Sequence, residues 1–215
     1  NYAAEKQAFE AELAAAGADS GSNLIEVPET KIAPKSEPKA FRLTKLWDAA
    51  DVKAPGNILI VQDEGSAPRL FVFDGWQTIV ELGTDGRQIQ RHELPIADRG
   101  AATFLRTTVD GQGKRWFLAS GISQQKLYLL DESFKIVLSY PEERHDGIAD
   151  AAFGDLRGDG EPEIIIGYWG IAGAQGISLD GNRLWSNREL ENVAHIAVSD
   201  PDRDGRREAL CLGSR

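Results

Sequence analysis

Short apolar runs alternate with polar turns along the chain from about residue 41 onwards. The runs are rich in β-branched and aromatic residues, and most of the turns contain Gly, Asp or Asn. No stretch of helix length with a helical apolar period interrupts them. This pattern predicts an antiparallel all-β domain. The clearest predicted strands are 57–61, 69–73, 78–82, 116–119, 126–130, 136–140, 164–168 and 195–198.

The apolar runs recur with a nearly constant period. Four of them end in an aspartate, at Asp63, Asp110, Asp155 and Asp200, with spacings of 47, 45 and 45 residues. Each aspartate is followed by a polar loop and a second apolar run, and a hairpin follows in the first three repeats. Four-stranded units at this period are typical of propeller blades, which must stack on one another to bury both faces. The predicted fold class is therefore all-β, a β-propeller-like array of four-stranded blades.

The chain divides into three predicted regions. Residues 1–17 are rich in helix-forming residues and predict a short N-terminal helix ending at Gly17, and residues 18–40 predict a linker rich in Pro and Ser. Residues 41–215 hold about four repeats. Trp47 and Trp185 stand at similar distances before a loop aspartate, so residues 41–48 match the last strand of a blade. That strand could join the C-terminal strands in one composite blade and close a small ring. Alternatively, the chain is a piece of a larger propeller, and we favour this second interpretation.

Composition and charge exclude several classes of partner. The 215 residues carry a net charge of −10 at pH 7, which disfavours binding to nucleic acid. No apolar run is long enough to span a membrane. Cys211 is the only cysteine, so no internal disulfide can form. No signal peptide is visible, but the chain begins at Asn1, which leaves room for a removed leader and an exported protein.

The fourth loop carries the strongest chemical signal. Residues 200–208 read Asp-Pro-Asp-Arg-Asp-Gly-Arg-Arg-Glu, with carboxylates at loop positions one, three, five and nine and Gly at six. Ca²⁺ prefers six to eight oxygen ligands, which a tight loop with alternating carboxylates supplies. The sequence therefore predicts a structural Ca²⁺ site. Its ligands would be the side chains of Asp200, Asp202, Asp204 and Glu208, with the carbonyl of Arg206.

This loop resembles the calcium loops of FG-GAP/VCBS repeats, which form blades of integrin α-subunit propellers and of many bacterial exported proteins. The resemblance extends over about residues 57–215, and its motif is strong only in the last copy. In the third loop Asp155, Asp159 and Glu163 keep ligand positions, but Arg157 replaces the third-position ligand and weakens the calcium prediction. In the first two loops the aspartates are expected only to cap turns.

The sequence contains no recognisable catalytic motif. His92, His145 and His195 lack paired metal-ligand spacing, and His195 is expected to be a packed or surface strand residue. No nucleophile elbow, phosphate loop or dinucleotide fingerprint is present. Tyr168 and Trp169 end a strand where loops gather, so we expect them to be an exposed ligand contact.

We therefore expect a non-catalytic, exported binding or scaffolding propeller that presents interblade loops to a protein or a carbohydrate surface. The alternative is the propeller portion of an enzyme of the quinoprotein or lyase type. That alternative requires ionisable groups to converge at a central funnel or an active site elsewhere in the chain. A third possibility is a structural spacer beside another domain.

Overall fold

The computed structural model of the chain describes residues 43–96, 101–121, 124–141 and 146–213. The chain separates into two units, Asn1–Thr44 and Lys45–Arg215. The predicted helix over 1–17 and linker over 18–40 lie outside the described residues. The description below concerns the second unit.

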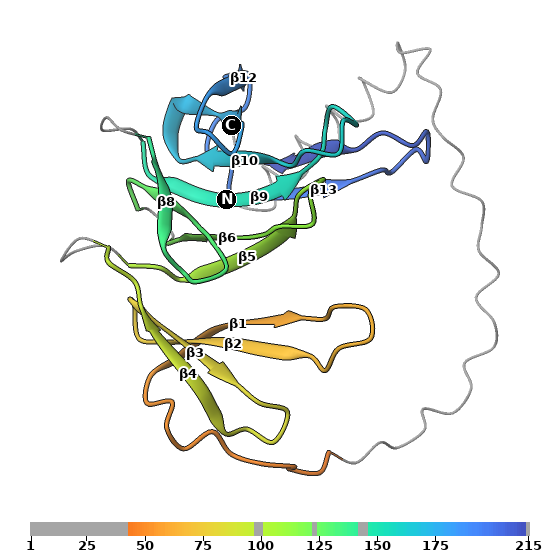
Figure 1. The fold of residues 1–215 in the computed structure, drawn as a ribbon. Helices are drawn as coiled ribbons and strands as arrows, with labels where there is room; N and C mark the ends of the chain where they lie inside the picture. The colour runs from red at the N-terminus through yellow and green to blue at the C-terminus, as the bar shows by residue number, and fades with distance from the viewer. Residues whose placement is uncertain (1–42, 97–100, 122–123, 142–145, 214–215) are drawn as a thin grey trace, which may run out of the picture. The chain divides into compact units, whose positions relative to one another are not determined.

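Antiparallel strands form four sheets in the described residues, and each sheet follows chain order (Figure 1). The first sheet contains β1 (Pro55–Val61), β2 (Arg69–Asp74), β3 (Thr78–Leu82) and β4 (Gln88–Glu93). The second contains β5 (Phe104–Val109), β6 (Arg115–Ser120), β7 (Leu127–Leu130) and β8 (Ile136–Tyr140). The third contains β9 (Ile148–Gly154), β10 (Glu163–Tyr168), β11 (Ala174–Ile177) and β12 (Arg183–Asn187), with the short 3₁₀ helix η1 (Gly170–Ala172) between β10 and β11. The fourth contains β13 (His195–Ser199) and β14 (Glu208–Leu212).

These sheets confirm the predicted all-β fold and its repeated four-stranded unit. The prediction that residues 41–48 form a last blade strand is wrong over the described part, because residues 43–49 are not in a strand. The indole of Trp47 instead lies over Gly86 in the β3–β4 turn, where an added Cβ would collide with the ring. Gly86 has a φ of 79°, which favours glycine at this turn on conformational grounds as well.

Apolar clusters join the sheets to one another in chain order. The cluster between the first and second sheets contains Phe71, Phe117 and Phe134, whose ring centroids lie 4.6 to 5.5 Å apart. Leu118, next to Phe117 on β6, belongs to the cluster shared with the third sheet. A third cluster includes Ile165 on β10 and Ile196 on β13. Neighbouring sheets thus bury the faces that they turn toward each other, as stacked repeats require.

This stacking brings together the first strands of successive sheets, and it also places the predicted calcium loops at a common end. The first strands of successive sheets lie next to one another, with β5 against β1 and β9, and β9 against β13. Because the strands run up and down, each first-to-second-strand loop lies at the same end of its sheet as the third-to-fourth-strand turn. The predicted calcium loops therefore belong to one end of the sheets (Figure 1).

Candidate functional site

The loop over residues 200–208 joins β13 to β14 and brings three of its predicted ligands together. Carboxylate oxygens of Asp200, Asp202 and Glu208 all lie within 4.8 Å of one another. Asp204 is not part of this group, and its Oδ1 accepts a hydrogen bond of 2.8 Å from the backbone N–H of Arg206. The loop therefore assembles a three-carboxylate cluster from its first, third and ninth positions.

Asp200 organises this loop through its backbone. Its Oδ1 accepts from the N–H of Asp204 at 3.1 Å, and its Oδ2 accepts from the N–H of Gly205 at 3.0 Å. Arg203 and Gly205 have φ values of 61° and 91°, which allow the chain to turn this tightly. Each carboxylate oxygen has two lone pairs, so these bonds leave acceptor capacity for a cation.

The loop over residues 155–163 joins β9 to β10 and repeats the same hydrogen bonds. Asp155 Oδ1 accepts from the N–H of Asp159 at 3.1 Å, and Asp155 Oδ2 accepts from the N–H of Gly160 at 2.9 Å. Asp159 Oδ1 accepts from the N–H of Glu161 at 3.0 Å, as Asp204 does in the next repeat. The two loops therefore share one backbone conformation at their aspartates, as their common motif predicts.

Arg157 makes the third loop different. Its Nε donates to Oε1 of Glu163 at 2.6 Å, and its Nη2 lies 3.3 Å from Oδ2 of Asp159. The hydrogen bond to Glu163, followed by the nearby acidic charges, raises the pKa of Arg157. The guanidinium thus pairs with carboxylates that a metal would need. The ligand role of Asp155, Asp159 and Glu163 stays a prediction, and Arg157 competes with it.

The surroundings of Glu208 in the fourth loop disfavour the charged form of its carboxyl group. Its pKa is raised, first by burial and then by the negative charges of Asp202, Asp204 and Asp200. Its Oε2 is buried and has no hydrogen-bond partner among the described residues. A cation at the cluster would satisfy this oxygen and offset the repulsion.

The first two loops hold their aspartates in other ways. Asp110 Oδ1 accepts from the N–H groups of Gln112 and Lys114 at 3.0 and 2.9 Å, as in an Asx turn. Its Oδ2 accepts from Trp116 Nε1 at 2.8 Å. Asp63 pairs with the guanidinium of Arg115 on β6. Asp110 thus caps its turn, as predicted, whereas the ion pair of Asp63 connects the first sheet to the second.

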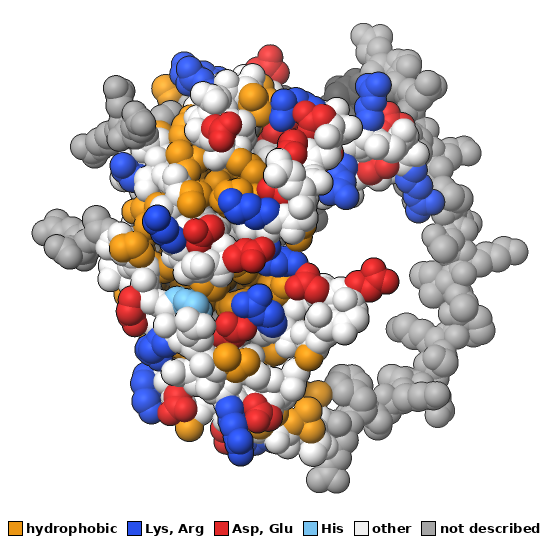
Figure 2. Space-filling view, viewed as in Figure 1, with side chains coloured by type: hydrophobic (Ala, Val, Ile, Leu, Met, Phe, Trp, Pro, Cys, Tyr) orange, Lys and Arg blue, Asp and Glu red, His pale blue; other side chains and the backbone are white. Residues whose placement is uncertain are grey.

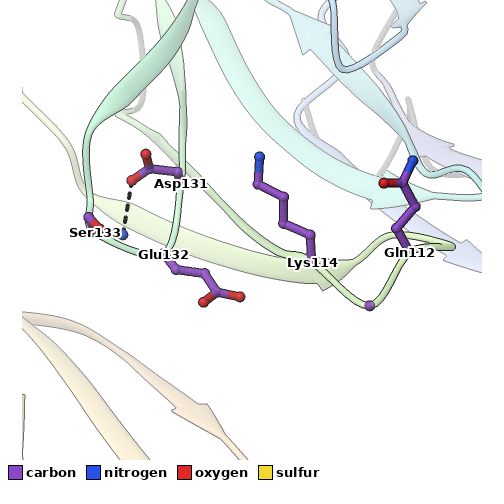
Figure 3. A pocket seen from close by; sticks show the side chains of 6 residues that line it. Gln112, Lys114, Asp131, Glu132 and Ser133 are labelled. Carbon is purple, nitrogen blue, oxygen red and sulfur yellow. Dashed lines mark hydrogen bonds between the residues drawn. The ribbon is translucent and has the colours of Figure 1, made fainter.

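A shallow pocket of about 390 Å³ lies between the β5–β6 loop and the β7–β8 turn (Figure 3). Lys114 rises from one wall and Asp131 from the other, but both have local roles. Lys114 Nζ lies 3.7 Å from the centroid of the Trp116 ring, and Asp131 Oδ1 accepts from the N–H of Ser133 at 2.9 Å. We therefore interpret this pocket as a product of turn packing.

Tyr168 is fully buried, which contradicts its predicted role as an exposed ligand contact. Its ring belongs to the cluster between the second and third sheets, and its hydroxyl lies 3.4 Å from Oε1 of Gln175. Burial is the main cause of a raised pKa at this hydroxyl. Trp169 is partly exposed, so its contribution to ligand binding stays a prediction.

Sequence reasoning missed a second group of ionisable residues. Arg106 on β5, Asp150 on β9 and His195 on β13 come from the first strands of three successive sheets and line one pocket of about 470 Å³. Asp150 Oδ1 lies 3.4 Å from Arg106 Nη2, and Asp150 Oδ2 lies 3.6 Å from His195 Nδ1. The available signal was position in the repeat, since Asp150 and His195 each precede a loop aspartate by five residues.

Acidic and basic side chains are interspersed on the face shown in Figure 2. The net charge of −10 therefore does not appear there as one continuous acidic surface.

Comparison with known proteins places the fold. No known protein family matches the chain, and no curated protein does so either. Among solved structures 17 chains match, including BBS1N, solved in complex with ARL6DN. The match to BBS1N has a TM-score of 0.50 at 14% identity, and it covers 67% of this chain.

BBS1N is a β-propeller, and the stacked antiparallel sheets of this chain are likewise propeller-like. The match covers 48% of the BBS1N chain, so this chain spans about half of that propeller protein. At this level of identity the likeness concerns the fold alone. Among the described residues no helix is long and apolar enough to cross a membrane.

Proposed function

We propose that this chain is a non-catalytic, exported binding propeller of the FG-GAP/VCBS type with a structural Ca²⁺ loop at residues 200–208. Its interblade loops contact a protein or a glycan. The observation that carries the proposal is the convergence of Asp200, Asp202 and Glu208 to within 4.8 Å.

Comparison of the third and fourth loops supports calcium in particular. Both loops have the same hydrogen bonds from backbone N–H groups to the first aspartate. In the third loop the guanidinium of Arg157 neutralises the carboxylates. In the fourth loop no arginine or lysine of the described residues pairs with the carboxylates. Hard oxygen ligands without histidine or thiolate suit Ca²⁺ better than transition metals.

The propeller-like fold supports a binding role. The similar propeller BBS1N was solved with a bound protein, ARL6DN, which is one example of a propeller that carries a partner. In the present chain the loops at one end of the sheets are polar, and the calcium loop would stiffen the last of them. A calcium-dependent propeller also suits an exported protein, because extracellular calcium can occupy weak sites.

Calcium titration of the wild-type chain tests the metal site. At a calcium concentration 100-fold above Kd, binding should stabilise the fold by about 2.7 kcal/mol. For a chain of this length that corresponds to a rise in Tm of roughly 5–10 °C. Calorimetry should show one site, and Glu208→Gln or Asp202→Asn should remove both the heat and the rise in Tm.

Asp159→Asn is the matched control, because Asp159 occupies loop position five of the third loop, beside Arg157. This variant should keep the wild-type response to calcium. A wild-type Tm that is unchanged between calcium and EGTA would contradict the calcium proposal.

A glycan array probed with the calcium-loaded chain separates the two ligand classes. Saturable binding to a defined glycan that EGTA abolishes would identify a carbohydrate ligand. Array binding that does not saturate would count against a glycan and leave a protein as the proposed partner.

A further inference from the structure

Asp150 lies between an arginine and a histidine side chain that come from two other sheets. It is 6% exposed, whereas the side chains of Arg106 and His195 are 42% and 74% exposed. Its Oδ2 also accepts from the backbone N–H of Ile196 at 3.2 Å. The buried carboxylate therefore holds two exposed nitrogen groups in place on neighbouring first strands.

Arg106 keeps most of its hydrogen-bonding capacity. A guanidinium has five N–H donors, and within the described residues only Nη2 has an acceptor, at the long distance of 3.4 Å from Asp150 Oδ1. Its plane also lies near the ring of Phe104, with 5.2 Å from Cζ to the ring centroid. The ring and Asp150 thus orient a guanidinium whose other donors can bind an anion.

His195 lines the same pocket, and its side chain is exposed. Its Nδ1 lies toward Asp150, so its Nε2 is on the opposite side of the ring. When both ring nitrogens carry protons, His195 can donate to Asp150 and to a ligand together. The permanent charge of Arg106 and its unused N–H donors favour an anionic ligand over a metal cation.

Apolar side chains form the rest of this pocket. Leu210 and Leu212 of β14 are 45% and 64% exposed, and Ile196 and Cys211 complete that side. The volume of about 470 Å³ can hold a small side chain together with its charged group. An inorganic anion would leave the apolar wall uncovered.

We propose that Arg106, His195 and the leucines of β14 form a binding site for a carboxylate that adjoins an aliphatic side chain, as in an acidic and apolar peptide. Arg106 binds the carboxylate and Leu210 and Leu212 contact the aliphatic group. This proposal adds a ligand class to the binding function proposed above, at a different place in the fold. Its test needs neither calcium nor the loop surface, so its failure is distinguishable from failure of that function.

NMR titration of the full chain with small probes tests the site through the imidazole signals of His195. N-acetyl-leucine should produce saturable shifts, and N-acetyl-leucinamide, which lacks the carboxylate, should bind roughly tenfold more weakly. N-acetyl-leucyl-aspartyl amide distinguishes a side-chain carboxylate from a terminal one. Inorganic phosphate should bind more weakly than N-acetyl-leucine, because it cannot contact the leucines.

Variants separate the charged and apolar parts of the site. Arg106→Gln should weaken N-acetyl-leucine binding at least tenfold, whereas Arg87→Gln, at a side chain 89% exposed on a β3–β4 turn, should leave it unchanged. Leu212→Ser keeps the ionic cluster, and should weaken N-acetyl-leucine binding without affecting acetate. Equal binding of the acid and the amide, wild-type affinity in Arg106→Gln, or shifts that do not saturate would each overturn the proposal.

Discussion

Single residues distinguish the loops of successive repeats, and Arg157 is the clearest case. The third and fourth loops have the same turn, but Arg157 occupies the position that Asp202 has in the fourth. Arg157→Asp should therefore create a second calcium site, and calorimetry should show two bound ions instead of one. Arg157→Ala is the control, since it removes the guanidinium without adding a ligand.

The same substitution should destabilise the calcium-free protein. Glu163 is 1% exposed and would lose its charged donor, which costs about 1–3 kcal/mol for a buried acceptor left unsatisfied. Calcium should raise the Tm of Arg157→Asp by more than that of Arg157→Ala, because Arg157→Ala keeps only the proposed site at residues 200–208. An unchanged stoichiometry of one ion in Arg157→Asp would show that the turn alone does not make a site.

His92 gives the protein a predicted sensitivity to acid. Its Nε2 is buried without a partner among the described residues, and its ring lies 4.4 Å from that of Phe134. Burial lowers the pKa of His92 below its usual 6.5. The unfolded chain therefore binds a proton first as the pH falls below 6.5, and the stability contributed by the neutral ring decreases until the folded pKa is reached.

Urea midpoints measured at pH 7.5 and 5.5 test this sensitivity. Wild type should lose stability between these two pH values, and His92→Phe should lose less. His195→Gln is the control, because the His195 side chain is 74% exposed. Equal losses in wild type and His92→Phe would assign the acid sensitivity to other groups.

At the scale of the elements, alternation and turn residues predict most strands to within one or two residues. Strands 78–82 and 136–140, for example, have the bounds predicted from the sequence. The prediction fails over residues 43–48, because Trp47 stands at the distance before a loop aspartate that Trp185 has in a strand, whereas its indole packs over Gly86 in a turn. It also missed Arg106, Asp150 and His195, since contacts between first strands of different sheets connect residues about 45 positions apart.

Close packing between the third and fourth sheets accounts for the small residue at the end of β9. A Cβ on Gly154 would lie 2.6 Å from Val198 Cγ1 on β13. Gly154→Ala should therefore destabilise the fold by about 1–3 kcal/mol through overpacking. Val198→Ala should rescue much of this loss, so that a double-mutant cycle from urea denaturation gives a favourable coupling. Purely additive effects would mean that the two strands do not press on each other here.

At the scale of the whole unit, each sheet is stabilised mainly through its neighbours, so damage to one interface should stay local. Phe117 and Leu118 are adjacent on β6, but they belong to the clusters on opposite faces of the second sheet. Phe117→Ala should cost roughly 3–5 kcal/mol and Leu118→Ala roughly 2–5 kcal/mol in a fully packed core. The two substitutions should loosen different interfaces of the second sheet, because successive strand residues point to opposite faces.

Hydrogen exchange under native conditions measures that difference strand by strand. Phe117→Ala should increase exchange most in β1–β4, since the Phe71–Phe117–Phe134 cluster joins this sheet to the second. Leu118→Ala should instead increase exchange in β9–β12, where Ile148 and Ile164 share its cluster. Because the two residues are neighbours on one strand, local damage to β6 cannot produce opposite patterns. Identical exchange profiles in both variants would show that the sheets unfold as one cooperative unit rather than as coupled repeats.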